Sequence, residues 1–158
     1  RIAEAIRTRL TELQPVDADF FAQRFADFDQ RLAEAEKGWD ASLAPYKGTK
    51  IVTYHRSWPN FVGRFGLDVM GYVEPKPGIP PSPQHTIDLI GEMKRENTII
   101  IVEPYFDLKT PQSVARATGA QVVVLAPSVG AEKEITDYIH LFDYNVKLLL
   151  AAFKAGGH

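Results

Sequence analysis

Apolar residues recur every three or four positions through the first part of the chain, a spacing that places them on one face of a helix. This pattern predicts one helix over Arg1–Leu13, which Pro15 ends. A second helix is predicted from Asp17, which can serve as its N-cap, to about Ala44. The apolar positions of the two helices are Ile2, Ile6, Leu10 and Leu13, then Phe21, Phe25, Phe28, Leu32, Ala35, Trp39 and Leu43.

The second predicted helix would be roughly 40 Å long at 1.5 Å per residue. A small domain does not need a helix of that length for its own core. Two interpretations are therefore open. The helix could pack on a sheet or form a coiled-coil arm, or it could be a spine that links two lobes.

From Lys50 onward, short apolar and β-branched runs alternate with helical patterns. The alternation predicts an α/β fold, with a four-stranded parallel sheet, helices on both faces and the long helix before it. The predicted strands are Ile51–Tyr54, Leu67–Val73, Thr98–Val102 and Gln121–Leu125, and the predicted helices are about Pro59–Phe65, Pro83–Asn97, Pro111–Thr118 and Glu134–Ala152.

Two serines are placed where they can cap helices of this α/β part. Ser57 precedes Pro59, and Ser82 directly precedes Pro83, a residue that the first turn of a helix tolerates. On the last helix, the apolar spacing predicts that Ile135 and Tyr138 face inward.

The composition of the chain excludes several classes of protein. The chain has 158 residues, of which 45% are apolar, so it can form one domain or one domain with an appendage. A formal charge of −2 gives no reason to expect nucleic acid as a partner. The absence of cysteine excludes disulfides and thiolate metal sites. The helical pattern already under way at Arg1 indicates a fragment of a longer protein.

Polar residues follow three of the predicted strands: His55 after the first, Glu103 after the third and Ser128 after the fourth. Because the carboxyl ends of parallel strands meet at one edge, these residues are expected there, and His55 is expected to face an open crevice. Imidazole and carboxylate ligate zinc and also suit manganese or iron, so His55 and Glu103 are candidate metal ligands. Alternatively, His55 is a satisfied loop histidine and Glu103 accepts hydrogen bonds from loop N–H groups.

Motifs for other chemistry are missing from the sequence. It contains no Gly-rich phosphate loop, no Gly-x-Ser-x-Gly elbow and no His-Glu-x-x-His pair. No acid–base pair stands out either, so we do not expect an enzyme.

Several segments together resemble the zinc- and manganese-specific solute-binding proteins of ABC importers, the TroA-like family. The segment Ile51–Leu67 is similar to the family's block in which a strand is followed by histidine, spaced aromatic residues and Gly-Leu. Four later blocks match in order and cover nearly the whole chain: Val73-Glu74-Pro75, Ile100–Phe106, Ala115–Ala120 and the closing segment Tyr138–Asn145.

The resemblance implies two α/β lobes joined by a long helix, with the metal held between the lobes. On that pattern, residues 1–14 end a missing N-terminal lobe, 15–46 form the spine helix, and 47–158 form the C-terminal lobe. The resemblance makes His55 the first ligand from this lobe and leaves two histidines to the missing one. It further implies a periplasmic or otherwise extracytoplasmic protein, membrane-anchored or not, that delivers its metal to the membrane permease of an ABC importer.

The chain departs from the family pattern at the second ligand of this lobe. The family commonly has an aspartate where this sequence has Ala126, so Glu103 is the substitute that we favour, with Asp143 second. Arg56 is an unusual neighbour for a cation site, because its positive charge opposes cation binding.

These departures keep alternatives open. The runner-up is an adhesion or partner-binding protein on the same fold with weak or no metal binding, and a small α/β enzyme ranks last. An isolated lobe would also expose apolar residues that could drive dimerisation of the fragment.

Overall fold

The computed structural model describes residues 1–157 and leaves His158 outside. The chain divides into two compact units, Arg1–Gly38 and the part from Trp39 onward, and the division falls inside a single long helix. Each unit is described by itself. The predicted boundaries at residues 14/15 and 46/47 remain predictions.

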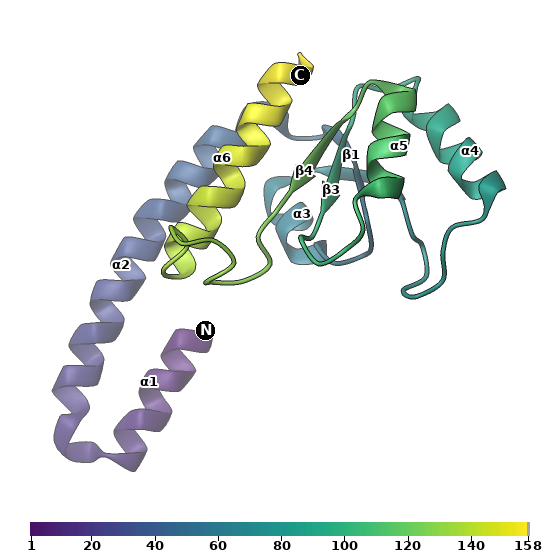
Figure 1. The fold of residues 1–158 in the computed structure, drawn as a ribbon. Helices are drawn as coiled ribbons and strands as arrows, with labels where there is room; N and C mark the ends of the chain where they lie inside the picture. The colour runs from purple at the N-terminus through teal and green to yellow at the C-terminus, as the bar shows by residue number, and fades with distance from the viewer. Residues whose placement is uncertain (158) are drawn as a thin grey trace. The chain divides into compact units, whose positions relative to one another are not determined.

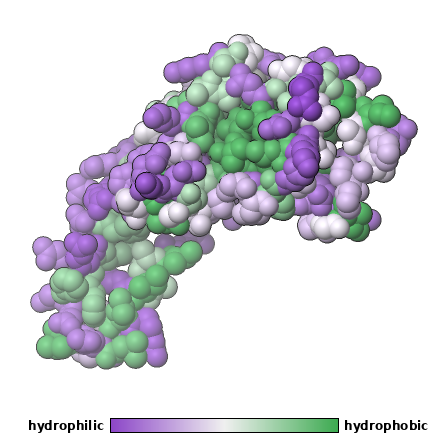
Figure 2. Space-filling view, in the orientation of Figure 1, coloured by the Kyte–Doolittle hydropathy of each residue, from purple (hydrophilic) through white to green (hydrophobic). Residues whose placement is uncertain are grey.

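The first unit is a helical hairpin without a core of its own. It contains α1 (Ile2–Leu13), a 3₁₀ turn (Pro15–Asp17) and the first part of α2 (Ala18–Leu43). Both helices agree with the predicted bounds to within one residue. Figure 1 shows α1 beside this part of α2, and Figure 2 shows apolar side chains along the hairpin. No residue of α1 is buried, and its apolar residues Ile2 and Leu13 are 81% and 65% exposed.

The second unit is an α/β sandwich, as the sequence predicted. Its four strands are all parallel and lie in the order β2-β1-β3-β4. Strand and helix bounds are β1 Lys50–Thr53, α3 Pro59–Phe65, β2 Asp68–Tyr72, α4 Pro83–Met93, β3 Ile99–Val102, α5 Lys109–Thr118, β4 Gln121–Val124 and α6 Tyr138–Gly156, with a 3₁₀ turn at Ala44–Tyr46.

Alternation along the central strands divides the core between the two faces of the sheet. Val52, Ile100 and Val102 face α4 and α5, where they pack against side chains such as Leu89 and Val114. The residues between them on β1 and β3 point to the opposite face, where α6 contacts β3 and β4. Figure 1 shows α5 and α6 covering different sides of the strands.

A bulge in β2 sets its register against β1. Ile51 lies opposite Val69, but Val52 lies opposite Gly71, so Met70 is an extra residue in β2. Beyond the bulge, Thr53 lies opposite Tyr72.

The bounds of α3 agree with the prediction but its cap differs, and α4 ends earlier than predicted. Trp58, and not Ser57, precedes α3, and it makes no side-chain capping bond. Helix α4 ends at Met93 and not near Asn97, because the next residues form tight turns. Ser82 does cap α4, since its hydroxyl accepts a hydrogen bond from the His85 N–H at 3.2 Å.

The start of α6 differs most from the prediction. The helix begins at Tyr138 and not at Glu134, because the Asp137 carboxylate caps it by accepting from the His140 N–H at 2.9 Å. Ile135 is buried as predicted, although it precedes the helix. Tyr138 is 47% exposed, so its predicted inward orientation is wrong.

The close approach of β2 to α4 gives a test of the core. A Cβ atom at Gly71 would lie 2.7 Å from Leu89 Cδ1, and Leu89 is buried. We therefore expect Gly71→Ala to lower the free energy of unfolding by about 1–3 kcal/mol, as overpacking does. The matched control is Gly91→Ala in α4, where nothing lies within 4 Å and alanine should add about 0.5–1 kcal/mol. Urea unfolding measures both variants, and equal effects would contradict this account.

Candidate functional site

Strand order creates a switch point between β1 and β3. From β1 the chain crosses to β2 on one side, and from β3 it crosses to β4 on the other. Ligands of open α/β sheets bind at the carboxyl ends of the strands at such a point. His55 and Glu103 each lie two residues beyond the paired residues Thr53 and Ile101, so both follow the central strands at the same level.

His55 occupies this edge with one ring nitrogen already engaged. Its Nδ1 lies 2.7 Å from the backbone carbonyl oxygen of Glu74. A carbonyl only accepts hydrogen bonds, so this contact assigns the proton to Nδ1 and leaves the lone pair on Nε2. That tautomer is the one in which Nε2 can ligate a metal.

The imidazole ring is more enclosed than an open crevice would make it. His55 is 7% exposed, and its ring meets Tyr54 and Phe106 edge-on, with centroids 4.8 and 4.7 Å apart. Tyr54 and Phe106 stack on each other at 4.5 Å. The aromatic pair therefore fixes the orientation of the ring.

Glu74 belongs to the same edge, although the sequence did not single it out. It lies two residues beyond Tyr72, the partner of Thr53 on β2. Its Oε1 is 3.7 Å from His55 Nε2, and its Oε2 accepts a hydrogen bond from the Tyr54 hydroxyl at 3.0 Å. A repeated motif could have identified it, because Val-Glu-Pro follows both β2 and β3, at residues 73–75 and 102–104.

Glu103 is buried without a partner. The residue is 1% exposed, and neither carboxylate oxygen has a hydrogen-bond partner within residues 1–157. The alternative expectation, that loop N–H groups would satisfy this carboxylate, is therefore wrong: the Phe106 N–H binds the backbone oxygen of Glu103 instead. An ionised carboxylate buried in this way carries a large desolvation cost, which a bound cation would offset.

The remaining candidate site residues lie elsewhere or already form hydrogen bonds. Ser128 is exposed on the loop after β4. Asp143 accepts a hydrogen bond from the Trp39 indole at 2.7 Å. At Ala126, the backbone N–H and C=O each bind the side-chain amide of Asn145 at 2.9 Å. These two hydrogen bonds hold the end of β4 against α6.

The described part of the chain contains no cluster of three candidate metal ligands. Among residues 1–157, no three His, Asp or Glu side chains lie close enough together to hold a metal ion. None of the helices within the same range is both long and apolar enough to cross a bilayer.

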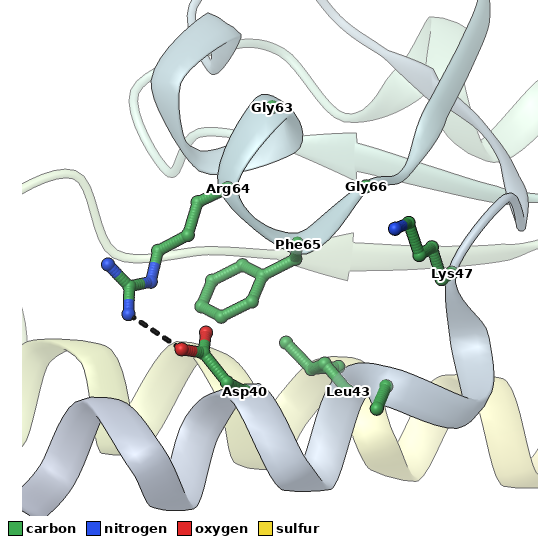
Figure 3. A pocket seen from close by; sticks show the side chains of 8 residues that line it. Asp40, Leu43, Lys47, Gly63, Arg64, Phe65 and Gly66 are labelled. Atoms are coloured by element: carbon green, nitrogen blue, oxygen red, sulfur yellow. Dashed lines mark hydrogen bonds and ion pairs between the residues drawn. The ribbon is translucent and has the colours of Figure 1, made fainter.

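A hollow of about 430 Å³ lies at the opposite edge of the sheet (Figure 3). It is bounded by residues that precede β1 and β2, among them Lys47 and Gly66, and by the ion pair of Arg64 with Asp40 at 2.9 Å. None of the candidate ligands lines it.

Comparison with known proteins places the chain in a family. The family model described as "Zinc-uptake complex component A periplasmic" (ZnuA) matches residues 1–152. The zinc-binding protein AdcA of Streptococcus pyogenes serotype M6 is 26% identical over 161 residues, covering 99% of this chain and 31% of AdcA. The high-affinity zinc uptake system protein ZnuA of Brucella abortus strain 2308 is 26% identical over 132 residues, covering 83% and 39%.

Solved structures share the fold. A crystal structure of ZnuA superposes with a TM-score of 0.79 at 26% identity, over 93% of this chain and 55% of that one. FpvC of Pseudomonas aeruginosa in complex with Mn²⁺ has a TM-score of 0.75 at 22% identity, over 96% and 58%. The laminin-binding protein Lbp of Streptococcus pyogenes has a TM-score of 0.74 at 20% identity, over 93% and 57%. The chain thus spans under two-thirds of the length of these proteins.

The hydrogen bond between Tyr54 and Glu74 predicts a dependence of stability on alkaline pH. Burial, followed by this hydrogen bond, raises the pKa of Tyr54 to about 12 from an unfolded value of about 10. The stabilisation is therefore complete below about pH 10 and is lost as the pH rises towards 12. We expect Tyr54→Phe to lose less stability than the wild type between these pH values.

Urea unfolding at pH 9, 10 and 11 measures that difference. Tyr46→Phe is a suitable control, since its ring stacks on Phe153. A Tyr54→Phe profile parallel to that of the wild type would contradict the assignment.

Proposed function

This chain belongs to the ZnuA family of periplasmic zinc-uptake components, and we propose that it is the C-terminal part of a solute-binding protein for an ABC importer. Its cargo would be a divalent transition metal, zinc first and manganese as the alternative. The protein would act outside the cytoplasm, deliver the ion to a membrane permease and carry out no catalysis.

The observation that carries this proposal is the pair of polar groups at the switch point. His55 has its Nε2 lone pair available, and Glu103, two residues beyond the neighbouring strand, has a buried carboxylate without a partner. We assign both as metal ligands. Histidine nitrogen and carboxylate oxygen are ligands that both zinc and manganese accept.

Glu74 supports the same site and adds a candidate. Two ligand atoms about 2.1 Å from one tetrahedral ion lie roughly 3.4 Å apart. The separation of 3.7 Å between His55 Nε2 and Glu74 Oε1 is close to that value. Glu74 is therefore a further candidate ligand beside His55.

The missing ligands would come from a part of the protein outside this chain. Zinc usually takes four ligands, whereas residues 1–157 bring no three candidates together. We propose that residues 1–14 end an N-terminal lobe, that 15–46 form the spine, and that 47–158 form the lobe described above. The metal would lie between the lobes.

Metal binding tests the ligand assignment in the longer protein that contains this chain. We expect Glu103→Gln and His55→Ala each to weaken zinc binding at least about tenfold. His140→Ala is the matched control, because His140 is exposed on α6 and pairs with Asp137. Competition with a chelator of known affinity at pH 7 measures the three variants.

Glu103→Gln separates ligation from a structural role by a second readout. Glutamine removes the carboxylate and keeps the shape of the side chain, so the metal-free variant should be at least about as stable as the wild type while binding zinc more weakly. A variant that is less stable and binds zinc with unchanged affinity would contradict the assignment.

Adhesion or partner binding on this fold is the second candidate function. Ala126 at the family's carboxylate position and the cationic Arg56 next to His55 both favour it. If the longer protein binds neither zinc nor manganese at micromolar concentration with His55 intact, adhesion becomes the better assignment.

A further inference from the structure

A hollow of about 270 Å³ opens beside the loop between β1 and α3. Its apolar wall comes from Pro59 and Val62 of α3 and from Val69 of β2. The other residues that line it are Thr53, Arg56, Trp58 and Tyr72. None of the residues assigned above to the metal lines this hollow, so it is a separate feature of the same sheet edge.

Arg56 brings an uncompensated positive charge to the hollow. Its guanidinium lies over the ring of Tyr72, 5.0 Å from the centroid, and the side chain is exposed. The structure pairs it with no carboxylate among residues 1–157. The stacking on Tyr72 positions the guanidinium, while its N–H donors stay available for an anion.

Trp58 lines the hollow with its ring. Its indole Nε1 is buried and has no hydrogen-bond partner within the described chain. The other tryptophan shows the usual arrangement, since Trp39 donates its indole N–H to Asp143 at 2.7 Å. Because the Trp58 N–H has no exposed surface, it does not serve as a donor in the hollow, but its NMR signal reports on a ligand that touches the ring.

We propose that this hollow binds a small monocarboxylate with an apolar body about the size of one ring. The carboxylate would pair with Arg56, and the body would lie against Val62 and Val69. The guanidinium has only donors and carries a positive charge, so it selects an anion. The volume lies just below the range of about 300–1,000 Å³ typical of drug-sized ligands, so it favours a small molecule over a polypeptide segment.

This inference goes beyond the proposed function and does not depend on it. A metal-free sample tests it, so the failure of one proposal leaves the other untouched. A carboxylate bound in the hollow would still favour cation binding nearby, because it would cancel the positive charge of Arg56 next to His55.

The two indole N–H signals in a ¹⁵N NMR spectrum of the chain provide the readout, with benzoate as the probe. Benzoate should move the Trp58 signal, identified by its loss in Trp58→Phe, and leave the Trp39 signal in place. Benzyl alcohol has the ring without the charge, and acetate has the charge without the ring. Both should bind at least about tenfold more weakly than benzoate.

Two substitutions test whether benzoate binding needs the positive charge of Arg56. Arg56→Gln should weaken benzoate binding at least about tenfold, and Arg56→Lys should retain part of it. The matched control is Arg95→Gln, an exposed arginine after α4 that does not line the hollow. Circular dichroism confirms that each variant is folded.

Three outcomes would overturn the proposal. Benzoate could leave the Trp58 signal unmoved at 20 mM, a concentration on the order of the weakest binding that matters here. It could bind Arg56→Gln as well as it binds the wild type. Finally, a short peptide ending in phenylalanine could bind more tightly than benzoate, which would assign the hollow to a polypeptide tail.

Discussion

The parallel pairing of β1 with β3 is the constraint on which the site depends. Both strands lie inside the sheet, where β3 is apolar throughout and β1 is apolar at Ile51 and Val52. The charged and ligand-type residues follow where these strands stop. Because paired parallel strands stop at the same level, His55 and Glu103 arrive together at one edge, and Glu74 joins them from β2.

That edge is polar in composition but enclosed by aromatic rings. Tyr54 and Phe106 shield the imidazole of His55, and Glu103 is almost fully removed from solvent. Attraction between opposite charges is stronger in such surroundings than in water, and an unpaired charge costs more free energy there. A buried carboxylate without a partner is therefore unfavourable, and such local conflicts are expected at functional sites more than in packing cores.

The sequence was sufficient for the sheet and only partly for the site. Runs such as Ile99–Val102 are recognisable because they consist of β-branched residues and are bounded by turn residues. The helix–strand alternation indicates that the strands are parallel. The start of α6 was misplaced because apolar spacing extends back to Ile135, while the Asp137 side chain decides where the helix begins. Glu74 was missed because the Val-Glu-Pro repeat marks the residue but not its contact with His55, which depends on strand register.

The bulge at Met70 has an effect on the neighbours of His55. Counting forward from the pair of Ile51 with Val69, a regular β2 would place Gly71 opposite Thr53. Val73 would then occupy the position beside His55, and an isopropyl group would replace a carboxylate. The bulge thus sets the register of the edge strand, and the same sequence paired without it would change the chemistry of the edge without altering the topology of the sheet.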